Sequence, residues 1–332
     1  MFSHRIKNIS PTKERIQPRR RSGFRIGLVL VTLATLGLAA TGLAAQKFSE
    51  WSEPVNLGPV INSSANDRHP AISKNGLSLY YTSNRPGGFG VDDILVSRRA
   101  SVDDPWGPPE NLGPNINTSS NDSVPTFSRD GHWMYFGSDR PGGSGALDIW
   151  ASYRANKRDD FGWQPATNLG SGVNSPQDEN GATYFEDDET GIITLYFTSL
   201  NRPGGFGDWD VYASTMNNDG SFGAAVLVPE LSSPSRDTRT AIRRDGLEMF
   251  VSSNRPGSFG DIDLWVSTRA TTTEAWSAPV NLGPTVNSTG DDGAPALSSD
   301  NKTIFFYSSR AGGFGGRDLY MITRTKLRGG QE

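Results

Sequence analysis

The 332-residue chain contains no cysteine and three histidines. Without cysteine it forms no disulfide, no thiolate metal site and no lipid attachment through a lipobox cysteine. Of the histidines His4, His69 and His132, the first precedes an apolar run, so a histidine-rich metal centre is excluded. Two acidic loops, 187–190 and 287–293, lack the spacing of a recognised calcium loop. We therefore expect no metal and no cofactor.

An excess of positive charge is also missing from most of the chain. The whole sequence carries 32 basic and 36 acidic residues, and residues 1–45 hold eight of the former and one of the latter. Subtraction leaves 24 basic and 35 acidic residues in the remainder. Nucleic acid is excluded as a partner, because binding it requires a basic surface that neutralises phosphates.

The first 45 residues differ in composition from the rest. Residues 1–25 form a basic segment, expected in the cytoplasm, and residues 26–45 are uncharged and apolar. About 20 apolar residues suffice to cross a ~30 Å hydrocarbon layer. A basic flank before an apolar run is typical of a signal peptide or of a membrane anchor. Leu43 fits a cleavage site poorly, so we predict an inner-membrane anchor with a periplasmic or otherwise extracytoplasmic remainder. Cleavage would instead give a secreted protein.

A glycine-rich segment, first seen as SNRPGGFGVDD at 83–93, recurs five times with a period of about 55 residues. Its arginine falls at Arg85, Arg140, Arg202, Arg255 and Arg310, and its closing aspartate at Asp93, Asp148, Asp210, Asp263 and Asp318. A second segment, WSEPVNLGPVIN in its first copy, begins at Trp51, Trp106, Trp163 and Trp276, with Phe222 starting a divergent copy. Five occurrences indicate an architectural unit.

The hydrophobic pattern within one period predicts four short strands. In the first period these cover 69–73, 77–83, 94–99 and a proline-marked edge strand at 106–113. Radial repetition of four antiparallel strands makes a β-propeller, so we predict an all-β propeller over 46–326 with a short tail at 327–332. The chain starts with a fourth-strand segment and ends with a third strand. We therefore expect five blades, closed by residues 51–58 pairing with 318–324.

The segment SRDGHWMYFGSDRPGGSGALDIW at 128–150 resembles the WD40-like propeller repeat, also called PD40, found in the propeller domain of TolB and in related bacterial envelope proteins. The resemblance covers about residues 51–324. It implies a β-propeller and an envelope protein as partner. The chain shows neither the α/β domain that precedes the propeller in TolB nor a peptidoglycan-binding domain after it, so the role of TolB itself is not transferred.

Both repeated segments are expected on one face of the propeller. The candidate binding residues there are the five arginines, the phenylalanines Phe89, Phe206, Phe259 and Phe314, and the acids Asp67, Asp122, Glu179, Asp237 and Asp292. The arginines and closing aspartates are expected to tie the loops together through charge-assisted hydrogen bonds. We expect the phenylalanines and tryptophans to pack between blades, with a pocket-lining role for the former and sugar stacking for the latter as alternatives.

The acids at the start of the inner strands are the one feature with enzymatic potential, since glycoside hydrolysis uses two carboxylates about 5 to 9.5 Å apart. Their recurrence in every repeat favours turn capping instead, and we assign no catalytic residue. The sequence thus predicts a non-enzymatic, TolB-like protein-binding or scaffolding module of the bacterial envelope. A lectin-like glycan-binding propeller and a five-bladed glycoside hydrolase are the alternatives.

Overall fold

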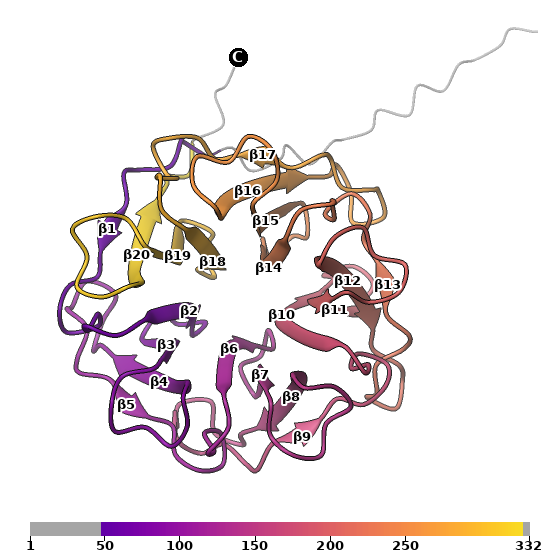
Figure 1. Cartoon of the computed structure of the whole chain (residues 1–332), viewed down its shortest axis with the longest axis horizontal. Helices are drawn as coiled ribbons and strands as arrows, with labels where there is room; N and C mark the ends of the chain where they lie inside the picture. Colours follow the sequence, from indigo (N-terminus) through magenta and orange to yellow (C-terminus); the bar gives the residue numbers. More distant parts are fainter. Residues whose placement is uncertain (1–47, 328–332) are drawn as a thin grey trace, which may run out of the picture. The chain divides into compact units, whose positions relative to one another are not determined.

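The computed structural model describes residues 48–327 as a five-bladed propeller of four-stranded antiparallel sheets (Figure 1). The predicted basic segment, the apolar helix at 26–45 and most of the tail lie outside the described residues. Within residues 48–327, no helix is long and apolar enough to cross a membrane. The anchor and the extracytoplasmic location stay predictions.

The first three blades follow one another along the chain. Blade 1 contains β2 (Asp67–Ile72), β3 (Ser78–Ser83), β4 (Asp93–Arg98) and β5 (Glu110–Asn111). Blade 2 contains β6 (Asp122–Phe127), β7 (Trp133–Ser138), β8 (Asp148–Tyr153) and β9 (Thr167–Asn168). Blade 3 contains β10 (Asp178–Glu186), β11 (Ile193–Leu200), β12 (Trp209–Thr215) and β13 (Val226–Leu227).

The last two blades complete the ring. Blade 4 contains β14 (Asp237–Ile242), β15 (Glu248–Ser253), β16 (Asp263–Thr268) and β17 (Val280–Asn281). Blade 5 joins β18 (Asp292–Leu297), β19 (Thr303–Ser308) and β20 (Asp318–Thr323) to β1 (Val55–Asn56). The first strand of each blade, namely β2, β6, β10, β14 and β18, surrounds the central axis (Figure 1).

The predicted closure is confirmed by the pairing of the first and last strands. Val55 lies opposite Met321 and Asn56 opposite Tyr320, in antiparallel register. The Asn56 side-chain amide also donates to Asp318 at 2.9 Å. Because the last blade takes its outer strand from the start of the described chain, the ring closes without leaving that sheet incomplete.

The outer strands are shorter than predicted. The expected strand at 106–113 forms only β5, two residues long. Pro108 and Pro109 have no backbone N–H to donate to β4, which limits regular pairing on this edge. Trp106 nevertheless packs as expected, with the Arg99 guanidinium 4.2 Å from its ring centroid.

Every inner strand contains a β-bulge, about half-way along the propeller axis. The bulged residue has a positive φ in all five blades: His69 (53°), Val124 (60°), Gly181 (66°), Arg239 (30°) and Ala294 (53°). Three of the five are followed by proline, which cannot donate a ladder hydrogen bond and favours a bulge. The bulges place side chains of very different size and charge at one level of the axis.

Candidate functional site

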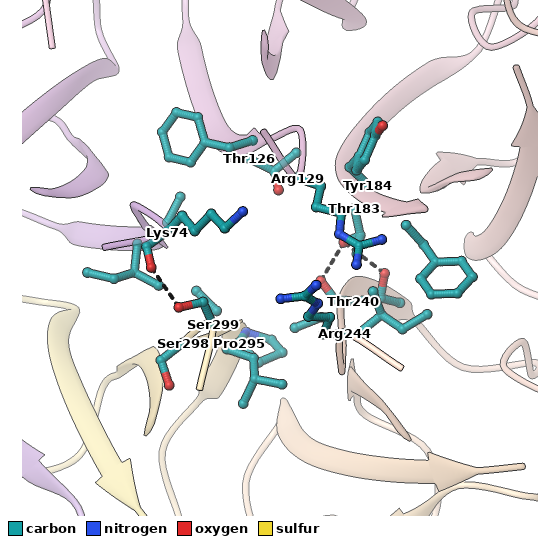
Figure 2. Close-up of a pocket in the computed structure, with 18 of the residues that line it drawn as sticks. Lys74, Thr126, Arg129, Thr183, Tyr184, Thr240, Arg244, Pro295, Ser298 and Ser299 are labelled. Atoms are coloured by element: carbon teal, nitrogen blue, oxygen red, sulfur yellow. Dashed lines mark hydrogen bonds between the residues drawn. The ribbon is translucent and has the colours of Figure 1, made fainter. Parts of the chain in front are cut away.

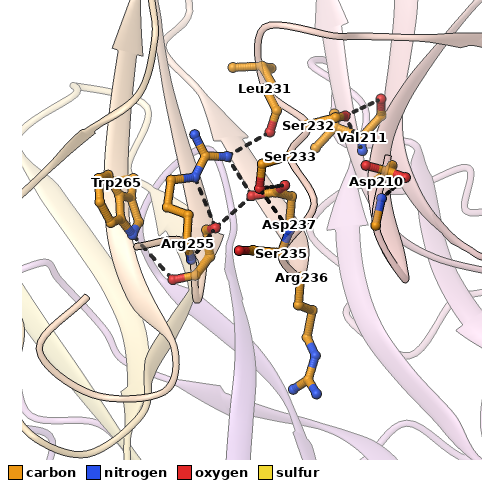
Figure 3. A network of polar contacts seen from close by, with 12 residues as sticks. Asp210, Val211, Leu231, Ser232, Ser233, Ser235, Arg236, Asp237, Arg255 and Trp265 are labelled. Carbon is orange, nitrogen blue, oxygen red and sulfur yellow. Dashed lines mark hydrogen bonds and ion pairs between the residues drawn. The ribbon is translucent and has the colours of Figure 1, made fainter. Parts of the chain in front are cut away.

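The predicted ring of acids is buried and fully engaged by the protein. Asp237 accepts hydrogen bonds from the Ser233 and Ser253 hydroxyls at 2.6 Å each and from Arg255 Nη2 at 2.5 Å (Figure 3). Its side chain is 0% exposed, and that of Arg255 is 11% exposed. Arg255 Nη2 also donates to the Leu231 carbonyl at 3.0 Å. A carboxylate held by this many donors has no lone pair directed at a ligand.

The same ion pair recurs in the other blades. The N···O distances are 2.7 Å for Arg85–Asp67, 2.6 Å for Arg140–Asp122, 3.6 Å for Arg202–Glu179 and 2.6 Å for Arg310–Asp292. All five acids are 0% exposed. The geometry agrees with the capping role and gives these carboxylates no access to a substrate.

The closing aspartates cap the glycine loops. Asp93 accepts from the backbone N–H of Phe89 at 2.7 Å and of Gly90 at 3.3 Å. Burial raises the pKa of the Asp93 carboxyl, and these two donors oppose the rise. A Cβ on Gly88 would lie 1.6 Å from Asp93 Oδ2, so only glycine fits there. The glycine-rich segment is therefore a structural turn.

The predictions for the tryptophans and for the loop phenylalanines have different outcomes. Trp163 and Trp276 are buried and have Arg154 and Arg269 at 4.3 and 4.2 Å from their ring centroids, which confirms their packing role. The prediction that the loop phenylalanines pack between blades is wrong. Phe89, Phe206, Phe259 and Phe314 are 47–53% exposed. The glycines of each loop, and not its phenylalanine, allow the loop to pack closely against its surroundings.

Arg239 lies on the axis between the two mouths of the propeller. Its Nη2 reaches from β14 to the carbonyls of Pro70 at 3.2 Å and Pro125 at 2.9 Å, in blades 1 and 2. The residue is 6% exposed, and its Nε and Nη1 have no hydrogen-bond partner among the described residues. Burial lowers the pKa of the guanidinium to about 9. Arg239 therefore remains cationic at neutral pH, with no carboxylate paired to it.

On the side of Arg239 where the inner strands begin, a cavity of about 190 Å³ is lined by His69, Trp209, Arg236, Tyr307 and Arg317, among others. The His69 ring meets Tyr307 edge-on at 5.8 Å. Burial, followed by the charges of Arg68, Arg239 and Arg317, holds the pKa of His69 well below its ordinary value of 6.5. His69 is therefore neutral in the folded protein at pH 7.

We expect His69 to make stability depend on pH. Below pH 6.5 the unfolded chain binds a proton at this position that the folded protein does not bind, so the free energy of unfolding falls as the pH falls. The slope is at most about 1.4 kcal/mol per pH unit. Urea unfolding at pH 7 and pH 5.5 checks this against His69→Gln, in which the loss should be smaller. Equal losses in both proteins would show that His69 protonates freely in the fold.

A second cavity, about 200 Å³ in volume, opens at the opposite end of the axis, where the inner strands end in hairpins (Figure 2). We call it the hairpin-mouth cavity. Its wall includes the hydroxyls of Thr126, Thr183 and Thr240 and the ring of Tyr184. Thr183 Oγ1 donates to the Thr240 carbonyl at 2.6 Å, which ties blade 3 to blade 4 beneath the opening. Glu186 is the carboxylate residue on this wall.

Three basic residues surround the hairpin-mouth cavity. Lys74 lies on one side, and Arg129 and Arg244 on the other (Figure 2). Each occupies the second position of the hairpin that links the first two strands of its blade. Arg129 is held by the Glu186 carbonyl at 3.1 Å and by an ion pair with Asp188. The sequence pattern of these hairpins predicts only turns, so the three basic residues were not among the predicted site residues.

No family model and no curated protein matches the chain. Solved structures similar to it include an α-L-arabinofuranosidase from Lactobacillus brevis, with a TM-score of 0.54, 14% identity and coverage of 82% of this chain and 93% of that chain. An endo-arabinase from Bacteroides thetaiotaomicron gives a TM-score of 0.54 and 17% identity, covering 86% of this chain and 100% of that chain. At these identities the likeness shows the fold.

These comparisons correct the predicted function. The prediction of a non-enzymatic, TolB-like protein-binding or scaffolding module is contradicted, because the similar solved structures include arabinofuranosidases, an endo-arabinase and exo-β-1,3-galactanases. The structure of TolB from Acinetobacter baumannii aligns with a TM-score of 0.49 and carries no argument. The WD40-like repeat family is not confirmed.

Proposed function

We propose that the protein binds a saccharide in the hairpin-mouth cavity. The observation that carries the proposal is the composition of the cavity wall, where threonine hydroxyls and Tyr184 adjoin Lys74 and Arg244 in a space of about 200 Å³ on the axis. Hydroxyl, amide and charged groups give hydrogen bonds to sugar hydroxyls, and aromatic or apolar surface packs against sugar rings. The cavity is held by five rigid sheets, so little ordering is needed when a ligand enters.

The similar solved structures support a carbohydrate ligand. They include arabinofuranosidases, an endo-arabinase and an exo-β-1,3-galactanase, the last with β-1,3-galactotriose. The face of the propeller that carries the glycine loops is a weaker candidate for the saccharide site, because its arginines and acids form ion pairs with one another. The earlier candidate binding residues on that face therefore remain a prediction, and the hairpin-mouth cavity is the stronger site.

A glycan microarray tests the proposal directly. The full chain in detergent is expected to bind a subset of immobilised glycans, and Tyr184→Ala to weaken that binding about tenfold through loss of ring contact with the sugar. Trp133→Ala is the matched control, since Trp133, the first residue of β7, is 40% exposed and does not line the cavity. Equal binding by wild type and Tyr184→Ala would place the saccharide elsewhere, and binding to no glycan would reject the proposal.

Glycoside hydrolysis is the second candidate function. Glu186, the last residue of β10, lies on the cavity wall, and Asp188 follows in the hairpin. Arg129 donates to the Glu186 backbone carbonyl and pairs with the Asp188 carboxylate. These two carboxylates are the candidates for acid and base. Reducing-sugar release from arabinan and β-1,3-galactan measures the activity. Glu186→Gln is expected to reduce release by about 100-fold or more, and release unaffected by Glu186→Gln and Asp188→Asn would exclude this pair.

A further inference from the structure

The basic residues of the hairpin-mouth cavity contrast with the charge of the molecule as a whole. Residues outside the first 45 have an excess of acids, as shown above, yet the cavity is lined by Lys74, Arg129, Arg239 and Arg244 against Glu186. Random placement of surface charge in an acidic protein would favour the opposite sign. The cavity therefore concentrates positive potential at one end of the axis.

Few carboxylates compensate these cations. Asp188 pairs with Arg129 and has its other oxygen 3.9 Å from Arg244 Nε. Glu186 Oε2 accepts a hydrogen bond from the Tyr184 hydroxyl at 3.1 Å. Lys74 has no ion-pair partner within residues 48–327, and its side chain points into the opening (Figure 2). At least the charge of Lys74 is available to a ligand.

Arg239 adds a second, independent sign of an anionic ligand. It lines the floor of the same cavity, it is nine-tenths buried, and its Nε and Nη1 lack partners among the described residues. A buried guanidinium without a carboxylate is costly, and a cation in such a place attracts anions strongly because water screens it poorly. The positive φ of Arg239 is shared by the bulge of every blade, so the uncompensated charge is what distinguishes this residue.

We infer that the saccharide bound by the hairpin-mouth cavity is acidic, carrying a carboxylate or sulfate group near Lys74, Arg244 and Arg239. This inference rests on the proposed saccharide binding and specifies its substrate class. The anionic oxygens would accept charge-assisted hydrogen bonds from Lys74 Nζ and the Arg244 guanidinium at the mouth. The Arg239 charge beneath them would favour the same group over a neutral hydroxyl. The threonines and Tyr184 would contact the rest of the ring.

The test compares acidic sugars with neutral sugars of the same shape. Isothermal titration calorimetry is done on the full chain in detergent with trimers of galacturonate, glucuronate and mannuronate, and with the carboxyl-reduced form of each. A sulfated galactotriose forms a separate arm, which distinguishes sulfate from carboxylate. We expect at least one acidic trimer to bind about tenfold or more tightly than its neutral counterpart, with the preference shrinking as salt is added.

Variants show whether the preference comes from this cavity. The double variant Lys74→Met/Arg244→Gln is expected to lose the preference while keeping its unfolding temperature, because both residues are exposed. Lys302→Met is the matched control, since Lys302 lies in the corresponding hairpin of blade 5 but does not line the cavity. It should keep the full preference.

The outcomes separate the inference from the proposed function. Equal binding of acidic and neutral trimers would overturn the inference and leave saccharide binding intact. A preference for the acidic trimer that persists in the double variant would also overturn the inference, because residues other than Lys74 and Arg244 would then bind the acidic group. Absence of binding to every trimer and to every glycan of the array would reject both.

Discussion

Replacing Asp237 with alanine is expected to lower the free energy of unfolding by about 3–5 kcal/mol. The variant leaves Arg255, 11% exposed, without its carboxylate, and it removes the acceptor of the Ser233 and Ser253 hydroxyls. Breaking one side of a buried ion pair costs more than the pair itself contributes, because the remaining charge stays buried. Equilibrium urea unfolding measures the loss.

A carboxylate on the same face provides the control for Asp237. Asp261 is 61% exposed and lies 3.9 Å from Arg236, so Asp261→Ala should change stability by about 0.5 kcal/mol or less. Unchanged stability of Asp237→Ala, together with a loss of saccharide binding or turnover, would contradict the capping role. The ring of acids would then return as a candidate functional site.

Removing residues 1–58 is expected to destabilise the propeller by about 5 kcal/mol or more, at least about a third of the stability of an ordinary domain. The truncation deletes β1 and with it the contacts of Trp51 with Phe250, at 5.8 Å between ring centroids, and of Leu57 with the core. Two partly buried side chains and several backbone hydrogen bonds together account for the estimate. Thermal unfolding followed by circular dichroism measures the effect.

A shorter truncation serves as the comparison for this experiment. A variant lacking residues 1–47 retains β1 and should unfold at nearly the same temperature as the full chain. If the variants lacking residues 1–47 and 1–58 unfolded at the same temperature, the pairing of β1 with β20 would not be what closes the ring in solution. The difference between the two truncations isolates the closing strand.

The fold was predictable because the same strand pattern occurs five times in the sequence. One period with four hydrophobic segments would be ambiguous, whereas five periods that begin with a fourth strand and end with a third determine both blade number and closure. The local packing was harder to predict from the sequence. The exposed position of Phe89 depends on how its glycine loop turns, and the shortness of β5 depends on two prolines whose effect on pairing is a matter of geometry.

The cavity was harder to predict than the fold, since its residues do not repeat. At the bulge of the inner strands the five blades carry His69, Val124, Gly181, Arg239 and Ala294. A comparison of the repeats by column shows Arg239 as the only cation of this set, and Lys74, Arg129 and Arg244 as cations at one hairpin position. That departure from repeat symmetry is the available signal. Repetition identifies the scaffold, and the positions that break it identify the ligand site.

The role of the loops at the other end of the axis follows from the same contrast. Arg85, Asp93 and their counterparts recur in every blade, and in the first blade Arg85 pairs with Asp67 while Asp93 caps its own glycine loop. Five equivalent ion pairs stabilise five equivalent turns, whereas one asymmetric ligand requires one asymmetric site. The hairpin-mouth cavity meets that requirement, because its basic residues come from blades 1, 2 and 4.

Hydrogen–deuterium exchange of the full chain with and without a bound acidic trimer tests the central claim most directly, since it locates the ligand on the molecule. We predict slower exchange in the hairpins at 73–77, 128–132 and 243–247, which carry Lys74, Arg129 and Arg244, and unchanged exchange in the glycine loops at 84–92 and 201–208. Slower exchange in the glycine loops, with the hairpins unaffected by a saturating trimer, would contradict the assignment of the site to this cavity.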